Sequence, residues 1–314
     1  MKNILITGGL GYIGGRLTKY LSEKKDIKTV ITTRRNHNLS RVKSKLNNTK
    51  IIATDYKSKE KIISMMNGAD AIIHLIGPDA HSRMRNKINN RYVDIIENLS
   101  DAANKTGIKK IIYFSTIHVY GNNLEGSVDE RTAPIPNKLF SSTHLLVENL
   151  LVNLAYNYRV SVVRCANVFG IPYFDNSKCW ELVINDFCKS AIKNKKIIIK
   201  SSGLEYKNFI AMEDVIAGTY FILQDKMGNQ INTIYNLGGA KVIRIIEIAE
   251  KIKIILKNSF NINCTVKIDN SLGDKINHVP FEYSIDKIKK LGFNPISLEK
   301  EIYRTLDYCM KNGK

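Results

Sequence analysis

Short apolar runs alternate with longer, mixed segments through the first half of the chain. Six runs are rich in Ile, Val and other residues that favour strands, and segments of helical length separate them. The predicted strands are Ile4–Thr7, Thr29–Thr33, Ile51–Ala53, Ala71–Leu75, Lys110–Ser115 and Val160–Arg164. The predicted helices are Ile13–Lys24, Lys59–Met66, Asn86–Thr106 and Ser141–Asn157. This alternation predicts an α/β fold with a doubly wound parallel sheet.

The second half of the chain is less regular. Loop signals at Pro172 and at Ser201-Ser202-Gly203 follow the last of these strands. The later predicted helices are Asp214–Gln224, Val242–Lys257, Ile285–Leu291 and Leu298–Met310, with strands at Lys196–Lys200 and Thr265–Ile268. We therefore expect residues 1–165 to form the doubly wound domain. Residues 166–314 are expected to form mainly a smaller, interleaved α/β region, with some segments returning to the first domain.

Composition narrows the class of protein. The chain has 314 residues, 44% of them hydrophobic and 25% charged, which is typical of a soluble globular protein. No apolar run is long enough to cross a membrane, so we expect a cytoplasmic protein without membrane contact. The five cysteines lack CxxC spacing, which predicts reduced thiols and no metal site.

The net charge of +19 raises the question of nucleic-acid binding. The lysines are spread along the whole chain, without a basic arm or an aromatic-interleaved patch. We therefore expect no nucleic-acid partner. A positive field that attracts an anionic substrate such as a nucleotide diphosphate is the milder interpretation.

A glycine-rich turn follows the first predicted strand. Gly8, Gly11 and Gly14 stand where the chain passes from strand to helix, in the sequence Thr7-Gly8-Gly9-Leu10-Gly11-Tyr12-Ile13-Gly14. Glycines permit a tight turn and close backbone approach, and the start of a helix favours a diphosphate. The turn predicts dinucleotide binding and a Rossmann-type sheet; a bare loop is the alternative that this motif alone leaves open.

The end of the second predicted strand bears on which dinucleotide is bound. Proteins that prefer NAD place a carboxylate about twenty residues past the glycines, where it accepts from the ribose 2′-hydroxyl. This chain has Arg34 and Arg35 there, and guanidinium groups suit a 2′-phosphate. NADP(H) is therefore favoured. NAD stays possible if the two arginines are solvated loop charges.

Further motifs occur in a fixed order along nearly the whole chain. They are Ala53-Thr54-Asp55, Asp70–Leu75, Ser115–Gly121, Arg164–Pro172, Lys207–Ile210 with Asp214-Val215, and Leu291–Pro295 with Ser297-Leu298-Glu299. With the glycine turn, they resemble extended short-chain dehydrogenases/reductases of the NAD-dependent epimerase/dehydratase family, which mostly act on nucleotide-activated sugars. The resemblance implies cofactor contacts at Gly8, Gly11, Tyr12, Ile13, Gly14, Arg34, Arg35, Asp55, Tyr56, Leu75 and His144.

The catalytic signature of that family is altered in this chain. The family's helical Tyr-x-x-x-Lys pair, followed by Glu, matches Phe140, His144 and Glu148 here. Phenylalanine carries no proton, so the usual acid/base is missing. The resemblance places Thr116 where a Ser or Thr orients the reacting hydroxyl. A histidine titrates near neutrality, so His144 is the first candidate for a catalytic or cofactor-contacting role.

Three further histidines remain to be placed. His118 and His81 are weaker candidates for the missing base, since either can be a loop or structural residue. His74 lies inside a predicted strand and is interpreted as a core residue. If His144 has no catalytic role, it fills the space that lysine occupies in the family.

Substrate contacts follow from the resemblance alone. It implies that Asn167 and Phe169 lie near the phosphates of the sugar nucleotide and that Lys207 replaces an arginine. Lys275 and His278 follow a Gly-Asp pair where relatives carry a diphosphate-binding arginine. The resemblance also implies a homodimer formed through the helices 86–106 and 141–157. Alternatively, the apolar faces of these helices cover the sheet.

These features predict an NAD(P)-dependent oxidoreductase that moves a hydride at a ring carbon, most often C4, of a nucleotide-diphosphate sugar. Epimerisation, ketoreduction and dehydrogenation stay open, with a single oxidation or reduction favoured. Dehydration is disfavoured because Ile117-His118 follow Thr116 instead of Asp-Glu. The alternative class is a catalytically silent regulatory or partner protein that binds a dinucleotide.

Overall fold

The computed structural model describes residues 2–34, 42, 44–78, 90–174, 178–225, 232–269 and 279–313. The chain folds into two units, and each is described by itself. Unit 1 comprises Met1–Asn122, Thr132–Cys165 and Thr219–Tyr235. Unit 2 comprises Asn123–Arg131, Ala166–Gly218 and Asn236–Lys314.

Unit 1 is built on a seven-stranded sheet with the order β3-β2-β1-β4-β5-β7-β11. Its strands are β1 (Lys2–Thr7), β2 (Ile27–Thr33), β3 (Thr49–Ala53), β4 (Ala71–His74), β5 (Lys110–Thr116), β7 (Arg159–Cys165) and β11 (Asn232–Leu237). The five pairings from β3 to β7 are all parallel. All four residues of β4 are buried, as expected for a strand covered on both faces. The predicted α/β class with a doubly wound parallel sheet is confirmed.

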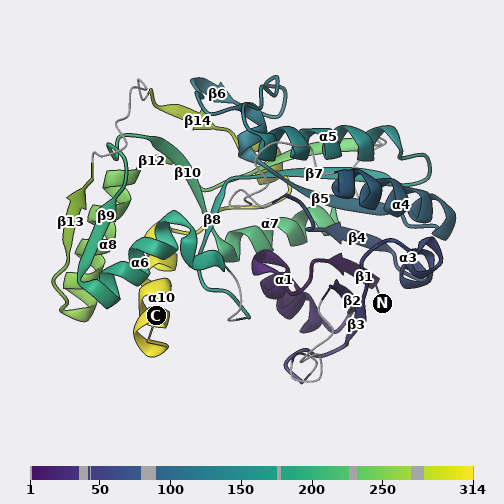
Figure 1. The fold of residues 1–314 in the computed structure, drawn as a ribbon, viewed down its shortest axis with the longest axis horizontal. Helices are drawn as coiled ribbons and strands as arrows, with labels where there is room; N and C mark the ends of the chain where they lie inside the picture. Colours follow the sequence, from purple (N-terminus) through teal and green to yellow (C-terminus); the bar gives the residue numbers. More distant parts are fainter. Residues whose placement is uncertain are drawn as a thin grey trace. The chain divides into compact units, whose positions relative to one another are not determined.

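Helices cover both faces of this sheet (Figure 1). They are α1 (Tyr12–Ser22), α3 (Lys59–Met66), α4 (Asn90–Thr106), α5 (Leu139–Asn153) and the C-terminal part of α7 (Met212–Gln224). α3, α4 and α5 share one apolar core with the sheet, and α1 lies on the other face, where Tyr20 packs edge-on against Tyr220 of α7. Ser58 caps α3 by accepting from the Lys61 N–H at 3.2 Å. The expected helix over 59–66 is therefore present with the same bounds.

Unit 2 contains a three-stranded sheet, β12-β10-β8, and two sheets of two strands. Its strands are β6 (Gly126–Val128), β8 (Asn167–Phe169), β9 (Lys196–Ile199), β10 (Tyr206–Ala211), β12 (Val242–Arg244), β13 (Thr265–Ile268) and β14 (Phe281–Tyr283). Its helices are α6 (Val183–Asn194), α8 (Ile245–Phe260), α9 (Asp286–Lys289) and α10 (Leu298–Lys311). Two 3-10 turns, η1 (Ile117–Tyr120) in unit 1 and η2 (Lys178–Glu181) in unit 2, complete the elements. An apolar core lies among α6, α8, α10 and the strands β9 and β10.

Several elements were not predicted, among them β6, β8, β10, β14 and α6, and two further differences have a clear cause. The expected helix Val242–Lys257 is wrong at its first three residues, which form β12, because Arg244 ends the strand and caps α8. The Arg244 N–H donates to the Glu247 carboxylate at 2.9 Å. The last strand of the main sheet, β11 (Asn232–Leu237), was not predicted, because Asn232, Thr233 and Asn236 interrupt its apolar pattern.

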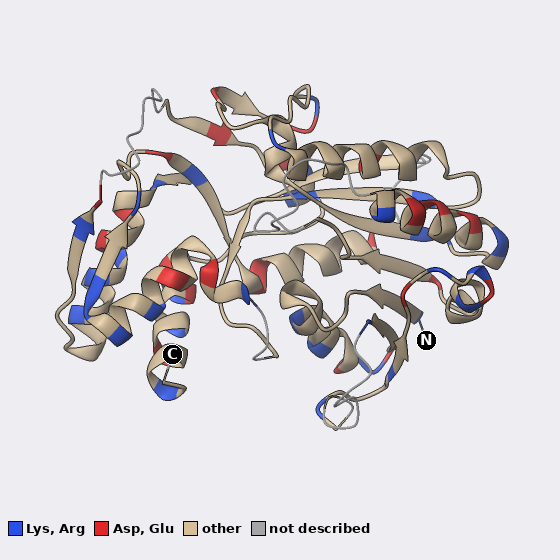
Figure 2. Ribbon diagram, viewed as in Figure 1, with Lys and Arg blue, Asp and Glu red and all other residues tan. Residues whose placement is uncertain are grey.

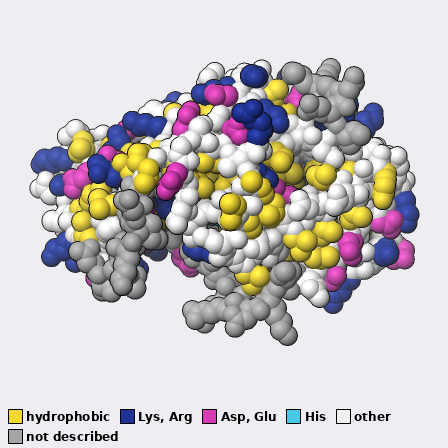
Figure 3. Space-filling view, turned by 90° about the horizontal axis from the view of Figure 1, so that it is seen from above, with side chains coloured by type: hydrophobic (Ala, Val, Ile, Leu, Met, Phe, Trp, Pro, Cys, Tyr) yellow, Lys and Arg dark blue, Asp and Glu magenta, His cyan; other side chains and the backbone are white. Residues whose placement is uncertain are grey.

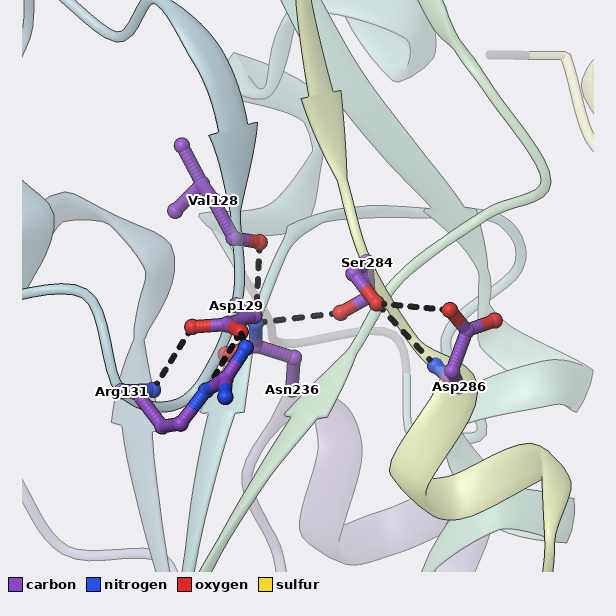
Figure 4. Close-up of polar contacts among 6 residues, drawn as sticks. All are labelled: Val128, Asp129, Arg131, Asn236, Ser284 and Asp286. Atoms are coloured by element: carbon purple, nitrogen blue, oxygen red, sulfur yellow. Dashed lines mark hydrogen bonds and ion pairs between the residues drawn. The ribbon is translucent and has the colours of Figure 1, made fainter.

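One asparagine joins three separate segments of unit 2. The Asn236 amide donates to the backbone carbonyls of Val128 at 3.4 Å and Ser284 at 3.1 Å (Figure 4). Its amide oxygen accepts from the Tyr283 hydroxyl at 3.0 Å. This buried amide connects β6 to β14, which explains why residues 123–131 belong to unit 2.

Basic side chains are spread over the surface and are not gathered in one patch of the described residues. Lys and Arg are distributed over the elements of both units (Figure 2), and the face in Figure 3 mixes basic and acidic side chains. All five cysteines are buried free thiols.

The described part of the chain has no helix long and apolar enough to cross a membrane. Among the same residues, no group of His, Cys, Asp and Glu is arranged to hold a metal ion.

Candidate active site

The glycine turn between β1 and α1 has the geometry of a phosphate-binding turn. Gly8 has a φ of +72°, and its carbonyl accepts from the Gly11 N–H at 2.9 Å. A Cβ at position 14 would lie 2.2 Å from the Gly8 carbonyl oxygen. Gly11 is the N-cap of α1 and has no side chain to cap it, so the start of the helix is open to an anion. A role for Gly9 was not predicted; its Cβ would lie 2.6 Å from Ile31 Cβ, which explains the second glycine of the motif.

A cavity of about 380 Å³ lies beside this turn. Its lining residues come from the carboxyl ends of β1, β2 and β4 and from the following loops. They are Gly8, Leu10, Gly11, Thr32, Thr33, Arg34, Tyr56, Leu75, Ile76 and Gly77. None of these described lining residues is acidic, and Arg34 is the one cation among them. The turn and the cavity together have the form of a Rossmann dinucleotide site.

Other predicted cofactor residues line an adjoining depression or belong to the start of α1. Asp55 lines an adjoining surface depression that shares Tyr56 with it. Tyr12 and Ile13 form the first turn of α1, and Gly14 packs against Gly8. Arg35 and His81 lie outside the described residues, as do Lys275 and His278.

Tyr56 has an unusual backbone conformation for a residue with a side chain. Its φ is +66°, and its hydroxyl hydrogen-bonds the Thr32 hydroxyl. Asn98 of α4 donates to its carbonyl at 3.4 Å. Burial raises the pKa of Tyr56, so the phenol stays protonated. These contacts fix the loop after β3 at the cavity wall.

Two buried histidines support the loop after β4. His74 Nδ1 lies 2.8 Å from the Thr7 hydroxyl, and the same imidazole hydrogen-bonds the Ile76 backbone. The Thr7 hydroxyl also accepts from the Leu75 N–H at 3.2 Å. We therefore infer that this hydroxyl donates its own proton to Nδ1 of His74, which accepts it. Burial lowers the pKa of His74 to about 4. The predicted core histidine is therefore a neutral link between β1 and the cavity wall.

His144 of α5 makes the same kind of link. Its Nδ1 lies 2.7 Å from the Tyr113 hydroxyl of β5, and its ring also hydrogen-bonds the backbone of Pro78. Proline offers only a carbonyl, so we assign the imidazole proton to the nitrogen that faces Pro78. A Cβ on Gly77 would lie 2.8 Å from His144 Cε1. Burial lowers the pKa of His144 to about 3, so its ring is neutral.

Phe140 lies one helical turn before His144, on the same face of α5. Its ring centroid is 4.8 Å from that of His144 and 6.1 Å from that of His118, with an edge-to-face arrangement in both pairs. Thr116 ends β5, and its hydroxyl accepts from the His118 N–H at 3.3 Å. The structure thus brings together Thr116, His118, Phe140 and His144 within unit 1.

A buried ion pair lies next to this group and was not predicted as part of it. Arg164 of β7 donates to the Glu148 carboxylate of α5 at 2.7 Å, and both side chains are 4% exposed. Glu148 also accepts from Ser115, the residue before Thr116. The Arg164 guanidinium lies 4.7 Å from the Tyr120 ring centroid. Both charged residues belong to recognised motifs, which was the available signal for their pairing.

Of the predicted substrate residues that are described, Thr116 lies in unit 1, and Asn167, Phe169 and Lys207 lie in unit 2. The Asn167 amide of β8 donates to the Asn208 carbonyl of β10 at 2.8 Å. Lys207, the residue before Asn208 on β10, is half-buried. The Phe169 side chain is 1% exposed and belongs to the apolar core. Asn208 holds both backbone groups of Gly239, at 2.8 and 3.1 Å. Asn167 and Lys207 are half-buried, whereas Phe169 is almost completely buried in the apolar core.

Unit 2 has a smaller cavity of about 170 Å³, next to Asp214. Both carboxylate oxygens of Asp214 accept from the Ile296 N–H, at 3.0 and 3.1 Å. Burial raises the pKa of Asp214 to about 6, and the bond from Ile296 opposes this shift. The Asp-Val motif therefore fastens the start of α7 to the segment before α10.

Comparison with known proteins places the chain within one family. The model of the NAD dependent epimerase/dehydratase family matches residues 4–238. The chain belongs to this family, which confirms the resemblance inferred from its motifs.

Relatives of this chain span most of its length. It is 25% identical over 327 residues to dTDP-D-glucose 4,6-dehydratase from Mus musculus, covering 99% of this chain and 89% of that protein. It is 26% identical over 323 residues to UDP-N-acetyl-alpha-D-glucosaminuronate decarboxylase from Bacillus cytotoxicus, covering 98% and 92%. Among solved structures, UDP-glucuronic acid 4-epimerase from Bacillus cereus, in complex with UDP-glucuronic acid and NAD, has a TM-score of 0.82 at 20% identity and covers 98% of this chain and 99% of that one.

Proposed function

We propose that this protein is an NAD(P)-dependent oxidoreductase that transfers a hydride at a ring carbon, C4 in the first instance, of a nucleotide-diphosphate sugar. The observation that carries the proposal is the glycine turn with its cavity, retained in the same unit as Thr116 at the end of β5. The names of the relatives supply the substrate class, since the dehydratase, the decarboxylase and the epimerase all act on dTDP- or UDP-linked sugars.

The residues present fit a dinucleotide. The N–H groups at the start of α1 face the diphosphate position, and Gly8 and Gly11 leave room for close approach. When bound, a nicotinamide dinucleotide supplies reversible hydride transfer, and the protein supplies binding, orientation and proton transfer.

We propose that NADP(H) is preferred over NAD(H). Arg34 lines the cavity at the end of β2, and the described lining has no carboxylate to accept from a ribose 2′-hydroxyl. A guanidinium favours a 2′-phosphate through charge-assisted hydrogen bonds. Arg35 remains a predicted second contact.

A single oxidation or reduction is favoured over epimerisation or dehydration. Phe140 cannot exchange a proton, and Ile117 and His118 follow Thr116 where dehydratases carry Asp-Glu. Thr116 is assigned to orient the reacting hydroxyl, while Asn167 and Lys207 are assigned to the substrate. Lys275 and His278 keep their predicted role at the diphosphate.

A homodimer formed through α4 and α5 belongs to the same proposal. α5 has half-buried Leu145 and Leu146 on its outer side, in addition to the buried residues that face the sheet. Sedimentation at micromolar concentration tests this: a monomer mass would contradict it.

A catalytically silent dinucleotide-binding protein is the second candidate, favoured by the loss of the hydroxyl at Phe140. The test begins with the fluorescence of NADPH and NADH titrated with the purified protein. Oxidised cofactor is then offered with UDP-, GDP-, dTDP- and CDP-sugars, and reduced cofactor with the matching keto-sugars. A redox change with any sugar supports the enzyme; tight cofactor binding without a redox change across the panel supports the silent protein.

A further inference from the structure

The ring of Phe140 is arranged edge-to-face with two imidazoles. Its edge-to-face partners are His144 at 4.8 Å and His118 at 6.1 Å between ring centroids. A phenol at this position would carry the exchangeable proton of the family's reaction, so its loss leaves the neighbouring side chains as the sources of a proton. Hydrogen bonds and burial distinguish among these side chains.

His144 is already engaged on both sides of its ring. Tyr113 lies 2.7 Å from Nδ1, Pro78 accepts from the imidazole, and the side chain is buried. Burial holds the pKa of His144 at about 3, so the ring does not take up a proton near neutral pH. His144 therefore supports the cavity wall at Gly77 and Pro78 and acts as a positioning residue.

Three other polar side chains of this part of unit 1 are also excluded as a base. Tyr113 is fully buried, and burial raises its pKa well above the usual value. The Glu148 carboxylate is engaged by the Arg164 guanidinium in a buried ion pair. Thr116 has a hydroxyl that orients an oxygen but does not titrate in the physiological range.

We propose that His118 is the acid/base residue of this site and takes the place of the missing tyrosine hydroxyl. Its ring lies 6.1 Å between centroids from that of Phe140, and its backbone N–H donates at 3.3 Å to Oγ1 of Thr116, the residue assigned to the reacting hydroxyl. Its side chain is half-exposed, in contrast to the buried His74 and His144, so protons can be exchanged with solvent. The assignment rests on the proposed function, because it requires an alcohol that is oxidised or a ketone that is reduced.

The step balances as follows when an alcohol is oxidised. The substrate O–H bond breaks and its proton passes to the neutral imidazole of His118, which becomes imidazolium. The C–H bond at the same carbon breaks, its electron pair leaves as hydride to the oxidised nicotinamide dinucleotide, and a C=O bond forms. His118 then releases the proton to water; reduction of a ketone is the reverse.

Single turnovers of wild type and H118A, with a sugar found active in the wild type, test the assignment. We expect H118A to slow cofactor reduction by about 10²–10⁴-fold. Fluorescence titration of the cofactor and calorimetric titration of the nucleotide sugar should show unchanged affinities, which separates a lost proton acceptor from a damaged site. Added imidazole should restore the rate in proportion to its free-base concentration. H118Q keeps the side-chain volume, is not expected to lose its fold, and should also be slow.

Each outcome has a distinct meaning. A wild-type rate in H118Q overturns the assignment and leaves the proposed function standing. A slow H118A that imidazole does not accelerate also overturns it, since the loss then does not arise from a missing base. Wild-type protein that reduces cofactor with none of the sugars overturns the proposed function itself, and the assignment falls with it.

Discussion

The Tyr113 hydroxyl of β5 lies 2.7 Å from Nδ1 of His144 on α5. This contact joins the central sheet to the helix that carries the altered catalytic pair. The same imidazole hydrogen-bonds the backbone of Pro78, the residue after Gly77 of the cavity lining, so His144 links β5 to the loop after β4. The histidine in the lysine position is therefore part of the support of the cofactor cavity.

Removing the Tyr113 hydroxyl should destabilise unit 1. Y113F leaves the buried His144 Nδ1 without its donor, which costs about 1–3 kcal/mol of unfolding free energy. Urea unfolding followed by circular dichroism measures this. Y156F is the matched control, since Tyr156 is 77% exposed, and it should leave the midpoint unchanged. Equal midpoints for Y113F and wild type would contradict the hydrogen bond.

Stability should fall as the solution becomes acidic below neutrality. His74 and His144 are neutral in the fold, with pKa values of about 4 and about 3, whereas the unfolded chain binds a proton at each near pH 6.5. The unfolded state binds more protons below that pH. Each histidine therefore removes about 2 kcal/mol of stability between pH 6.5 and pH 5.

Unfolding in urea at pH 7, 6 and 5 checks this dependence. H144N removes one titrating group and should have a shallower decline than wild type, although it is less stable at pH 7. A decline as steep as that of wild type would show that His144 is already protonated in the fold.

Arg34 should decide the preference between the two nicotinamide dinucleotides. R34S removes a charge-assisted contact to a 2′-phosphate, worth about 1.5–3 kcal/mol, and should weaken NADPH binding by roughly ten- to a hundredfold. NADH binding should change little, because it lacks that phosphate. R131S, at a side chain that is 93% exposed in unit 2, is the control. Equal losses for NADPH and NADH in R34S would contradict the 2′-phosphate contact.

The ion pair of Glu148 and Arg164 should be costly to break from one side. E148Q leaves the buried guanidinium without its counter-charge, and the expected loss is about 3–5 kcal/mol. In E148Q/R164M both charges are gone, so the double variant should recover part of the loss. Thermal unfolding of wild type, E148Q, R164M and the double variant measures the coupling. Additive losses in the double variant would show that the two side chains do not interact.

Much of unit 1 follows from local sequence patterns. The apolar runs identify six of its strands because parallel strands are buried on both faces, and the glycines identify the turn because their backbone must approach Gly8. β11 is harder to predict from its sequence, because the side chain of Asn232 is there for a tertiary contact: its amide oxygen accepts from the Val160 N–H at 3.1 Å. β12 was read as helix because three residues are too few to establish a period.

The side-chain partners in the site are not local. Tyr113 and His144 are 31 residues apart, and Ser115 and Glu148 are 33 apart, so their contacts arise only when α5 packs on β5. The motifs indicated that Phe140 and His144 replace a catalytic pair. They did not indicate that His144 is held neutral by a tyrosine and a carbonyl, because that depends on burial.

Transfer of a labelled hydride tests the central claim most directly. Purified protein is incubated for one turnover with oxidised cofactor and nucleotide sugars that carry deuterium on the ring carbons, and the cofactor is analysed by mass spectrometry. The account predicts that deuterium appears in the reduced nicotinamide, with the C4-labelled sugar as the first expected donor. Cofactor that binds the protein but acquires deuterium from none of the sugars would contradict it.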